Sequence, residues 1–132
     1  MPLRIVAIKA QTPIMDRAAL ERELKKAVRD QQADGVRYMA EYPPARADST
    51  YRRTGTLKRS WHAPAVRVDG NTIAGEIASQ GQIAPYNVKV QGQDQDPFFA
   101  SRGWRDVEIL ARRVQKQFPP RVQKAIDRAA KA

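Results

Sequence analysis

The stretch YRRTGTLKRSW, residues 51–61, gathers side chains that could bind anions. Its four cations, Arg52, Arg53, Lys58 and Arg59, surround a Thr54-Gly55 turn, and Tyr51 and Trp61 flank them. Lysine and arginine bind phosphates or carboxylates, and aromatic rings can stack on bases. The stretch therefore predicts a contact surface for nucleic acid or for another protein.

Two other residue pairs could act in catalysis or in metal binding, but each lacks a group that this role requires. Ser60 and His62 would share one face of a strand, yet no acid is placed to orient the imidazole. Asp94 and Asp96 lack the later ligands of a calcium loop. The sequence contains no GxxxxGK[ST] or GxGxxG phosphate loop, no Cys and a single His. We therefore predict no enzymatic activity, no cofactor and no metal site.

Charge is the strongest signal in the composition. The 132 residues carry a formal net charge of +10. Residues 1–62 hold 13 Lys and Arg against 7 Asp and Glu, and residues 63–132 hold 11 against 7, so the excess is spread along the chain. Such a body is attracted to polyanions, although a solvated surface explains the same charge. With no long apolar run and no secretion leader, we expect a soluble cytoplasmic domain spanning residues 1–132 and no membrane contact.

The first half of the chain predicts a strand and a long helix. Residues 3–8 alternate as a strand does, and Thr12-Pro13 supplies the start of a helix that continues to about Glu41. The helix carries an apolar stripe: Leu20, Leu24, Ala27, Val28, Gly35, Tyr38, Met39 and Tyr42. Prolines then end it, and residues 43–56 are predicted to be a flexible basic loop.

The second half predicts a small sheet and a final helical region. Residues 63–78 form a hairpin around Asp69-Gly70-Asn71, and Tyr86, Val88 and Val90 alternate as a third strand. Helical spacing runs from Trp104 to Phe118, ends at Pro119-Pro120, and resumes as a short helix over 119–132. The predicted fold is α+β, with the long N-terminal helix and the C-terminal helix packed on a small antiparallel sheet.

The first helix looks too long for so small a domain. About 28 residues would extend roughly 40 Å, as wide as the whole globule. We therefore expect the end of its apolar stripe, Tyr38, Met39 and Tyr42, to lie at a subunit interface. Trp61 has two interpretations, a core anchor where the hairpin begins or a ring that stacks on bases, and the first is preferred.

The order of these motifs resembles a known family. RTGTLKRSW at 53–61 is similar to the R-T-G-x-L-x-x-S-hydrophobic signature of the small tail-completion, or neck, proteins of long-tailed bacteriophages. A hairpin, APYNVKVQG at 84–92 with Tyr86, QDQDPFF at 93–99 and RGWRDV with Trp104 follow in the family's order. The chain departs from the pattern at Lys89, at Gln91-Gly92 and at Asp96.

The resemblance implies a non-enzymatic virion protein, made in the bacterial host cytoplasm, that joins the head connector to the tail as one subunit of a homo-oligomeric ring. Its partners would be copies of itself, a head-closure or connector protein, and a tail terminator or tail tube, with the packaged DNA as a further candidate contact. Thr54, Gly55 and Leu57 would form the structural turn, with Arg52, Arg53, Lys58 and Arg59 facing partners. The alternative function is a small basic nucleic-acid-binding domain.

Overall fold

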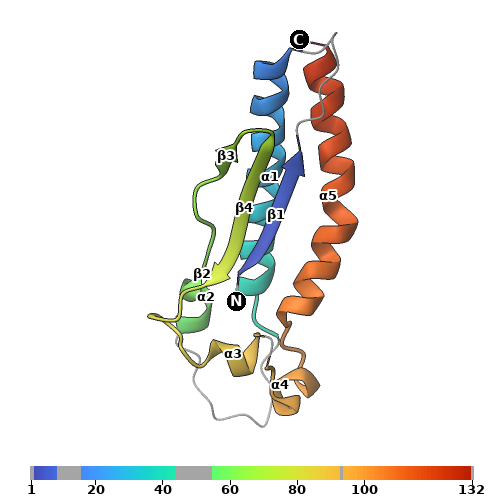
Figure 1. Cartoon of the computed structure of the whole chain (residues 1–132). Coiled ribbons are helices and arrows are strands. Elements are labelled where there is room, and N and C mark those ends of the chain that lie inside the picture. Colours follow the sequence, from blue (N-terminus) through green and yellow to red (C-terminus); the bar gives the residue numbers. More distant parts are fainter. Residues whose placement is uncertain (1, 9–15, 44–54, 93, 132) are drawn as a thin grey trace.

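The computed structural model of the chain describes residues 2–8, 16–43, 55–92 and 94–131. Its elements, in chain order, are β1 (Leu3–Ile8), α1 (Arg17–Ala40), α2 (Thr56–Ser60), β2 (Trp61–His62), β3 (Arg67–Asp69), β4 (Thr72–Ser79), α3 (Asn87–Val90), α4 (Pro97–Ser101) and α5 (Val107–Ala130). Two long helices lie beside a small sheet, and the three short helices gather at one end of the molecule (Figure 1). The predicted α+β class, with two long helices on a small antiparallel sheet, is confirmed.

Strand β4 organises the sheet. It pairs antiparallel with β1 on one side, and with both β3 and β2 on the other. The predicted hairpin is β3–β4, where Asp69 pairs with Thr72 across a two-residue loop. Gly70 begins that loop with φ +59°, a left-handed conformation that glycine adopts without a steric penalty.

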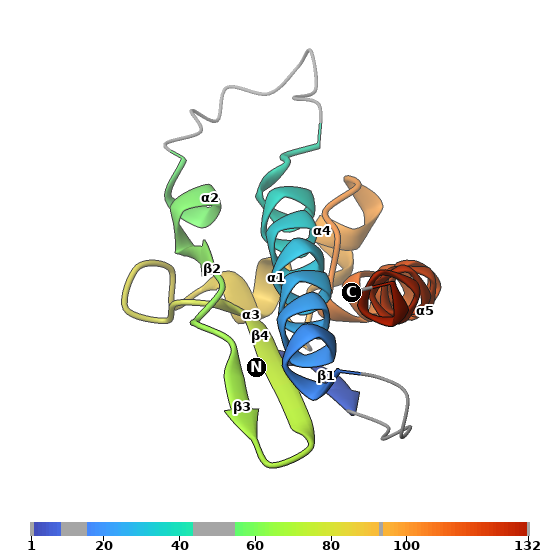
Figure 2. The same ribbon diagram turned by 90° about the horizontal axis from the view of Figure 1, so that it is seen from above.

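The core forms where α1 crosses the inner face of the sheet. It includes Ile5, Leu20, Leu24, Val28, Met39, Ile73, Ile77 and Leu110, all at most 3% exposed. Gly75 of β4 permits the close approach, because a Cβ there would lie 2.7 Å from the side chains of Val28 and Gln32. Seen along the helices, α5 lies beside α1 (Figure 2). Helix α1 is therefore covered by the sheet on one side and by α5 on another.

Helix α1 begins with a cap that the sequence analysis did not select. The Asp16 carboxylate accepts hydrogen bonds from the backbone N–H groups of Ala18 and Ala19, which have no partner within the helix. The predicted start at Thr12-Pro13 lies outside the described residues. The helix ends with Ala40, close to the predicted Glu41.

The predicted third strand, Tyr86 to Val90, is wrong. Asn87–Val90 form the helical turn α3, in which the Gln91 N–H donates to the Asn87 carbonyl at 2.8 Å. The buried residues are Asn87 and Val90, three apart, whereas Tyr86 and Val88 are exposed. A short alternation of apolar residues is compatible with either a strand or a helical turn. Here the buried residues follow the helical spacing.

The predicted break at Pro119-Pro120 is also wrong. Both prolines lie inside α5, which runs without interruption to Ala130, so residues 119–132 do not begin a separate helix. Each proline costs about 3 kcal/mol in a helix interior. The apolar stripe keeps its phase across them, since Leu110 and Val114 before and Ala125 and Ala129 after are all buried in the main core. This continuous packing outweighs the penalty.

Candidate partner-binding surfaces

The basic signature is only partly described. Tyr51, Arg52, Arg53 and Thr54 lie outside the described residues. Gly55, at φ 80°, is the N-cap of α2. Leu57 is buried in a second apolar cluster with Ala84 and Val90, and Tyr42, Phe99 and Trp104 pack against that cluster. The apolar part of the signature is therefore used within the chain.

Trp61 begins a buried hydrogen-bond relay. It is 6% exposed and belongs to the main core, and its indole N–H donates to Gln91 Oε1 at 2.9 Å. Gln91, which is fully buried, donates from Nε2 to the Met39 carbonyl at 2.9 Å. Met39 lies in the last turn of α1, where carbonyls have no donor within the helix. The relay thus ties the signature to the end of α1.

A second relay holds the end of α2. Ser60 Oγ donates to the Leu57 carbonyl at 2.7 Å, so Ser79 must donate its hydroxyl hydrogen to Ser60 Oγ, 2.9 Å away. Asn87 Nδ2 in turn donates to Ser79 Oγ at 2.9 Å. From the sequence, Gln91 was noted only as a departure from the family pattern and Asn87 was not selected, because a polar side chain gives no sign of burial in the sequence.

The two described cations of the signature face outward. Lys58 and Arg59 are exposed. The Lys58 backbone N–H donates to the Tyr42 hydroxyl at 3.0 Å, and Arg59 Nη2 donates to Thr56 Oγ1 at 3.4 Å. The signature is therefore divided: Leu57, Ser60 and Trp61 pack inside the chain, and its described charges are exposed.

The expected interface at the end of α1 needs correction. Met39 is fully buried in the chain's own core and has no surface to offer a neighbour. Tyr38 and Tyr42 are half-buried, and the Tyr42 ring packs against Trp104 with 5.1 Å between ring centroids and a tilt of 54° between the ring planes. The stripe that seemed surplus is covered by α5 and by the segment before it.

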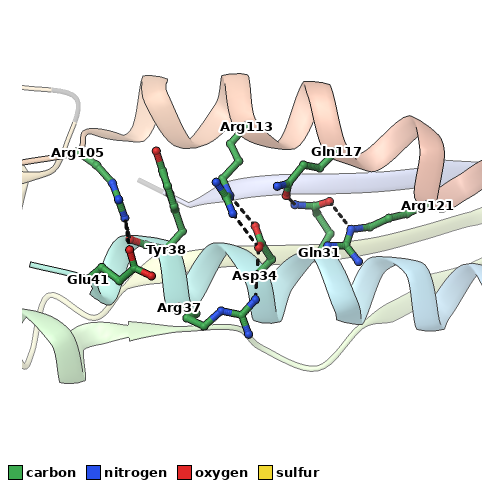
Figure 3. A network of polar contacts seen from close by, with 9 residues as sticks. All are labelled: Gln31, Asp34, Arg37, Tyr38, Glu41, Arg105, Arg113, Gln117 and Arg121. Atoms are coloured by element: carbon green, nitrogen blue, oxygen red, sulfur yellow. Dashed lines mark hydrogen bonds and ion pairs between the residues drawn. The ribbon is translucent and has the colours of Figure 1, made fainter.

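Helices α1 and α5 meet through a line of polar contacts, here called the polar seam (Figure 3). It comprises Gln31, Asp34, Tyr38 and Glu41 from α1 and its end, and Arg105, Arg113, Gln117 and Arg121 from α5 and the residues before it. Asp34 accepts two hydrogen bonds from Arg113, at 2.8 Å from Nε and 3.1 Å from Nη2. Gln31 donates to Gln117 Oε1 at 3.1 Å and accepts from Arg121 Nε at 3.0 Å.

Tyr38 lies between two guanidinium groups at one end of the seam. The Arg105 and Arg113 guanidinium carbons lie 3.7 Å and 4.1 Å from the ring centroid, within the range of cation–π attraction. Arg105 also donates to the Tyr38 carbonyl at 2.6 Å and to Glu41 Oε2 at 3.0 Å. Arg105 therefore caps a second carbonyl in the last turn of α1.

Asp34 is the electrostatic centre of the seam. Its side chain is 7% exposed. The hydrogen bonds from Arg113 lower the pKa of its carboxyl below the usual 3.8, against the opposing effect of burial, and the charges of Arg113, Arg121 and Arg37 add to the lowering. Asp34 is thus a carboxylate at neutral pH and fixes the position of Arg113.

Positive charge is concentrated on α5. Residues 102–131 carry nine Lys and Arg against three Asp and Glu, whereas residues 16–41, which include α1, carry six of each. An open groove of about 740 Å³ runs beside α5, and its wall includes Arg112, Arg113, Lys116, Arg121 and Lys124 but no acidic residue. The positive charge was predicted to be spread along the chain, so this surface was not expected from the sequence.

Large apolar side chains are exposed at the end that carries the short helices. Tyr86, just before α3, is 48% exposed, and Val88, on α3, is 46% exposed. Phe98 on α4 is 54% exposed, and Ile83, earlier in the chain, is 38% exposed. Arg102 stacks over the Phe98 ring at 4.4 Å. Exposed aromatic and apolar side chains with arginine beside them are typical of protein-binding surfaces.

The residue pairs considered for catalysis have structural partners. His62 Nδ1 lies 3.0 Å from the Ala78 carbonyl. Asp94 pairs with Lys89, and Asp96 caps α4 by accepting from the Phe98 N–H at 2.9 Å. Across the described ranges, no three His, Cys, Asp or Glu side chains gather as a metal site. Nor does any described helix have the length and apolar character needed to cross a bilayer.

Comparisons with known proteins add no relative. No protein-family model, no curated protein and no solved structure matches the chain.

Proposed function

We propose that the chain is a structural subunit of a bacteriophage or prophage neck, which forms a ring with copies of itself and joins the head connector to the tail. The observation that carries the proposal is the division of the signature. Leu57, Ser60 and Trp61 serve the fold, while Lys58 and Arg59 are exposed. A signature whose hydroxyl and indole groups are used in buried hydrogen bonds within the chain, and whose described charges are exposed, suits a joint better than a catalytic loop.

The exposed apolar end supports the same proposal. A ring needs an interface in which one patch of a subunit meets a different patch of its neighbour. Tyr86, Val88 and Phe98 supply a candidate patch of the required chemistry, since large apolar side chains with cations nearby resemble the centre and rim of an interface. This patch replaces Met39 as the proposed contact between subunits.

The proposed partners are further copies of the chain, a head-closure or connector protein and the tail terminator or tube. The test is to co-express the chain with the products of its neighbouring reading frames, then to measure mass by light scattering and to image the particles by negative stain. We expect closed rings bound to a connector or a tube protein. A Tyr86→Asp, Phe98→Asp double variant should fold and fail to assemble.

Val6→Asp, Ile8→Asp is the matched control for this variant. Val6 and Ile8 are 39% and 71% exposed on β1, away from the short helices, so the control adds the same two negative charges to a different surface. The proposal fails if the chain remains monomeric with every neighbouring product. It also fails if both variants assemble as the unchanged chain does.

A further inference from the structure

We infer that the α5 face bearing Lys116, Arg121, Lys124 and Arg128, here called the α5 quartet, binds the phosphate backbone of double-stranded DNA. This inference stands apart from the proposed neck function, because it concerns a surface other than the signature or the apolar end. It moves the expected DNA contact from the basic loop to a helix.

The quartet is chosen because, among the described residues, no carboxylate forms an ion pair with it. Asp127 on the same helix accepts from Gln123 at 3.0 Å, and Asp34, on which the charge of Arg121 also acts, is bonded to Arg113. Lys116, Lys124 and Arg128 are exposed, and among the described residues their side chains form no hydrogen bond or ion pair. Arg121 is held by the neutral Gln31 amide. In contrast, Arg112 pairs with Glu108 at 2.6 Å and Arg113 with Asp34.

The nearest acids on α1 are already paired. Glu23 and Asp30 line the same small pocket as Arg121, Lys124 and Arg128. Asp30 lies 3.3 Å from Lys26, and Glu23 lies 4.0 Å from Arg22. The local field of the quartet is therefore positive and open to an external anion.

The geometry suits a long polyanion. The quartet lies within about half the helix circumference and extends over about 18 Å from Lys116 to Arg128, the length of about 5 base pairs. Arg121 is ordered before binding by Gln31, which reduces the entropy lost when a phosphate is bound.

Duplex nucleic acid is favoured over an acidic protein and over single strands. The centre of a protein interface is usually apolar and poor in charge, but five of the nine residues that line the α5 groove are Lys or Arg. Single strands need exposed rings for stacking. Tyr38, the aromatic ring in the groove lining, is already stacked by Arg105 and Arg113.

The test measures binding of a labelled 30-base-pair duplex by fluorescence anisotropy between 50 and 200 mM salt, the range over which phosphate contacts weaken steeply. The test variant is Lys116→Gln, Lys124→Gln, Arg128→Gln. The control is Arg4→Gln, Arg29→Gln, Arg67→Gln, three exposed cations on β1, α1 and β3. Both variants lower the net charge equally, and both should melt at the temperature of the unchanged chain.

Losing three phosphate contacts should lower affinity by about 100-fold near 100 mM salt and reduce the slope of log K against log salt by about 2.7. The control should keep its affinity within about threefold and its slope within about one unit. The inference is overturned if the two variants weaken equally, because net charge would then explain the binding. It is also overturned if the unchanged chain fails to bind at 50 mM salt.

Two further arms separate the remaining explanations. A variant with Arg52, Arg53, Lys58 and Arg59 changed to Gln should bind as the control does, and selective loss in this variant would place the DNA contact on the basic loop instead. Poly-glutamate of matched length should bind more weakly than the duplex. If it binds as tightly, the quartet recognises acidic protein and the DNA inference is wrong.

Discussion

Trp61→Phe tests whether the signature is part of the fold. Phenylalanine keeps an apolar ring but removes the indole N–H, so the buried Gln91 Oε1 loses its donor. A buried acceptor left without a partner costs about 1–3 kcal/mol, and the smaller ring costs about 1 kcal/mol more. We expect the free energy of unfolding to fall by about 2–4 kcal/mol, which lowers the melting temperature by about 8–16 °C in a domain of this size.

The assay is thermal and urea unfolding followed by circular dichroism, with Lys58→Ala as control. Lys58 is exposed in the same signature, so its truncation should change the free energy by less than about 0.5 kcal/mol. Combining Trp61→Phe with Gln91→Leu completes a double-mutant cycle, for which we expect a coupling of about 1–2 kcal/mol. Additive effects, or a Trp61→Phe protein as stable as the unchanged chain, would refute the relay from Trp61 to the end of α1.

Three further changes test other contacts. Gly75→Ala should destabilise by about 1–3 kcal/mol in urea titration, because its Cβ would lie 2.7 Å from Gln32, whose amide donates to the Pro64 and Glu76 carbonyls. At Gly81, an added Cβ would have no atom within 4 Å, so Gly81→Ala should change the free energy of unfolding little. An equal loss of stability in the Gly75 and Gly81 variants would contradict the close approach of α1 to β4. Met39→Glu should abolish cooperative unfolding by circular dichroism, since it buries a charge, and a folded variant would restore Met39 as an interface residue. Because the folded-state pKa of Asp34 is lowered, its contribution is complete above about pH 4 and is lost as the pH falls further. Asp34→Asn should therefore be less stable than the unchanged chain at pH 7, and the difference in urea midpoints should shrink at pH 2–3.

Periodicity predicted the elements that are long or closed by a distinctive turn. Strand 3–8 and the long first helix were recognised from spacing because each has one buried face. The hairpin was recognised from its turn at Gly70, since β4 has a buried face but β3 is exposed throughout. Residues 86–90 were misassigned because four or five residues satisfy both periods. The prolines at 119 and 120 were given too much weight, although the apolar stripe that continues beyond them was already visible in the sequence.

The candidate surfaces were less predictable than the fold. Gln31, Asp34, Tyr38 and Glu41 recur at helical spacing, and that signal is present in the sequence. It does not reveal which helix lies opposite, because pairing is a tertiary property. The burial of Met39 depends on the same unknown and became clear only when α1 and α5 were placed side by side. The excess of positive charge over residues 102–131 is visible in the sequence and was missed because the charge was counted by halves of the chain.

The polar seam also constrains the order in which the chain can fold. Its partners are far apart along the chain: 79 residues separate Asp34 from Arg113, and 90 separate Gln31 from Arg121. Strand β1 likewise pairs with β4, which comes much later in the chain. Contacts at such separations close large loops and slow the folding of a domain. During synthesis, α1 leaves the ribosome long before β4 and α5, which cover most of it. We expect truncated chains that stop before α5 to be sensitive to proteases, and the full chain to acquire resistance in one late step after the final helix has emerged.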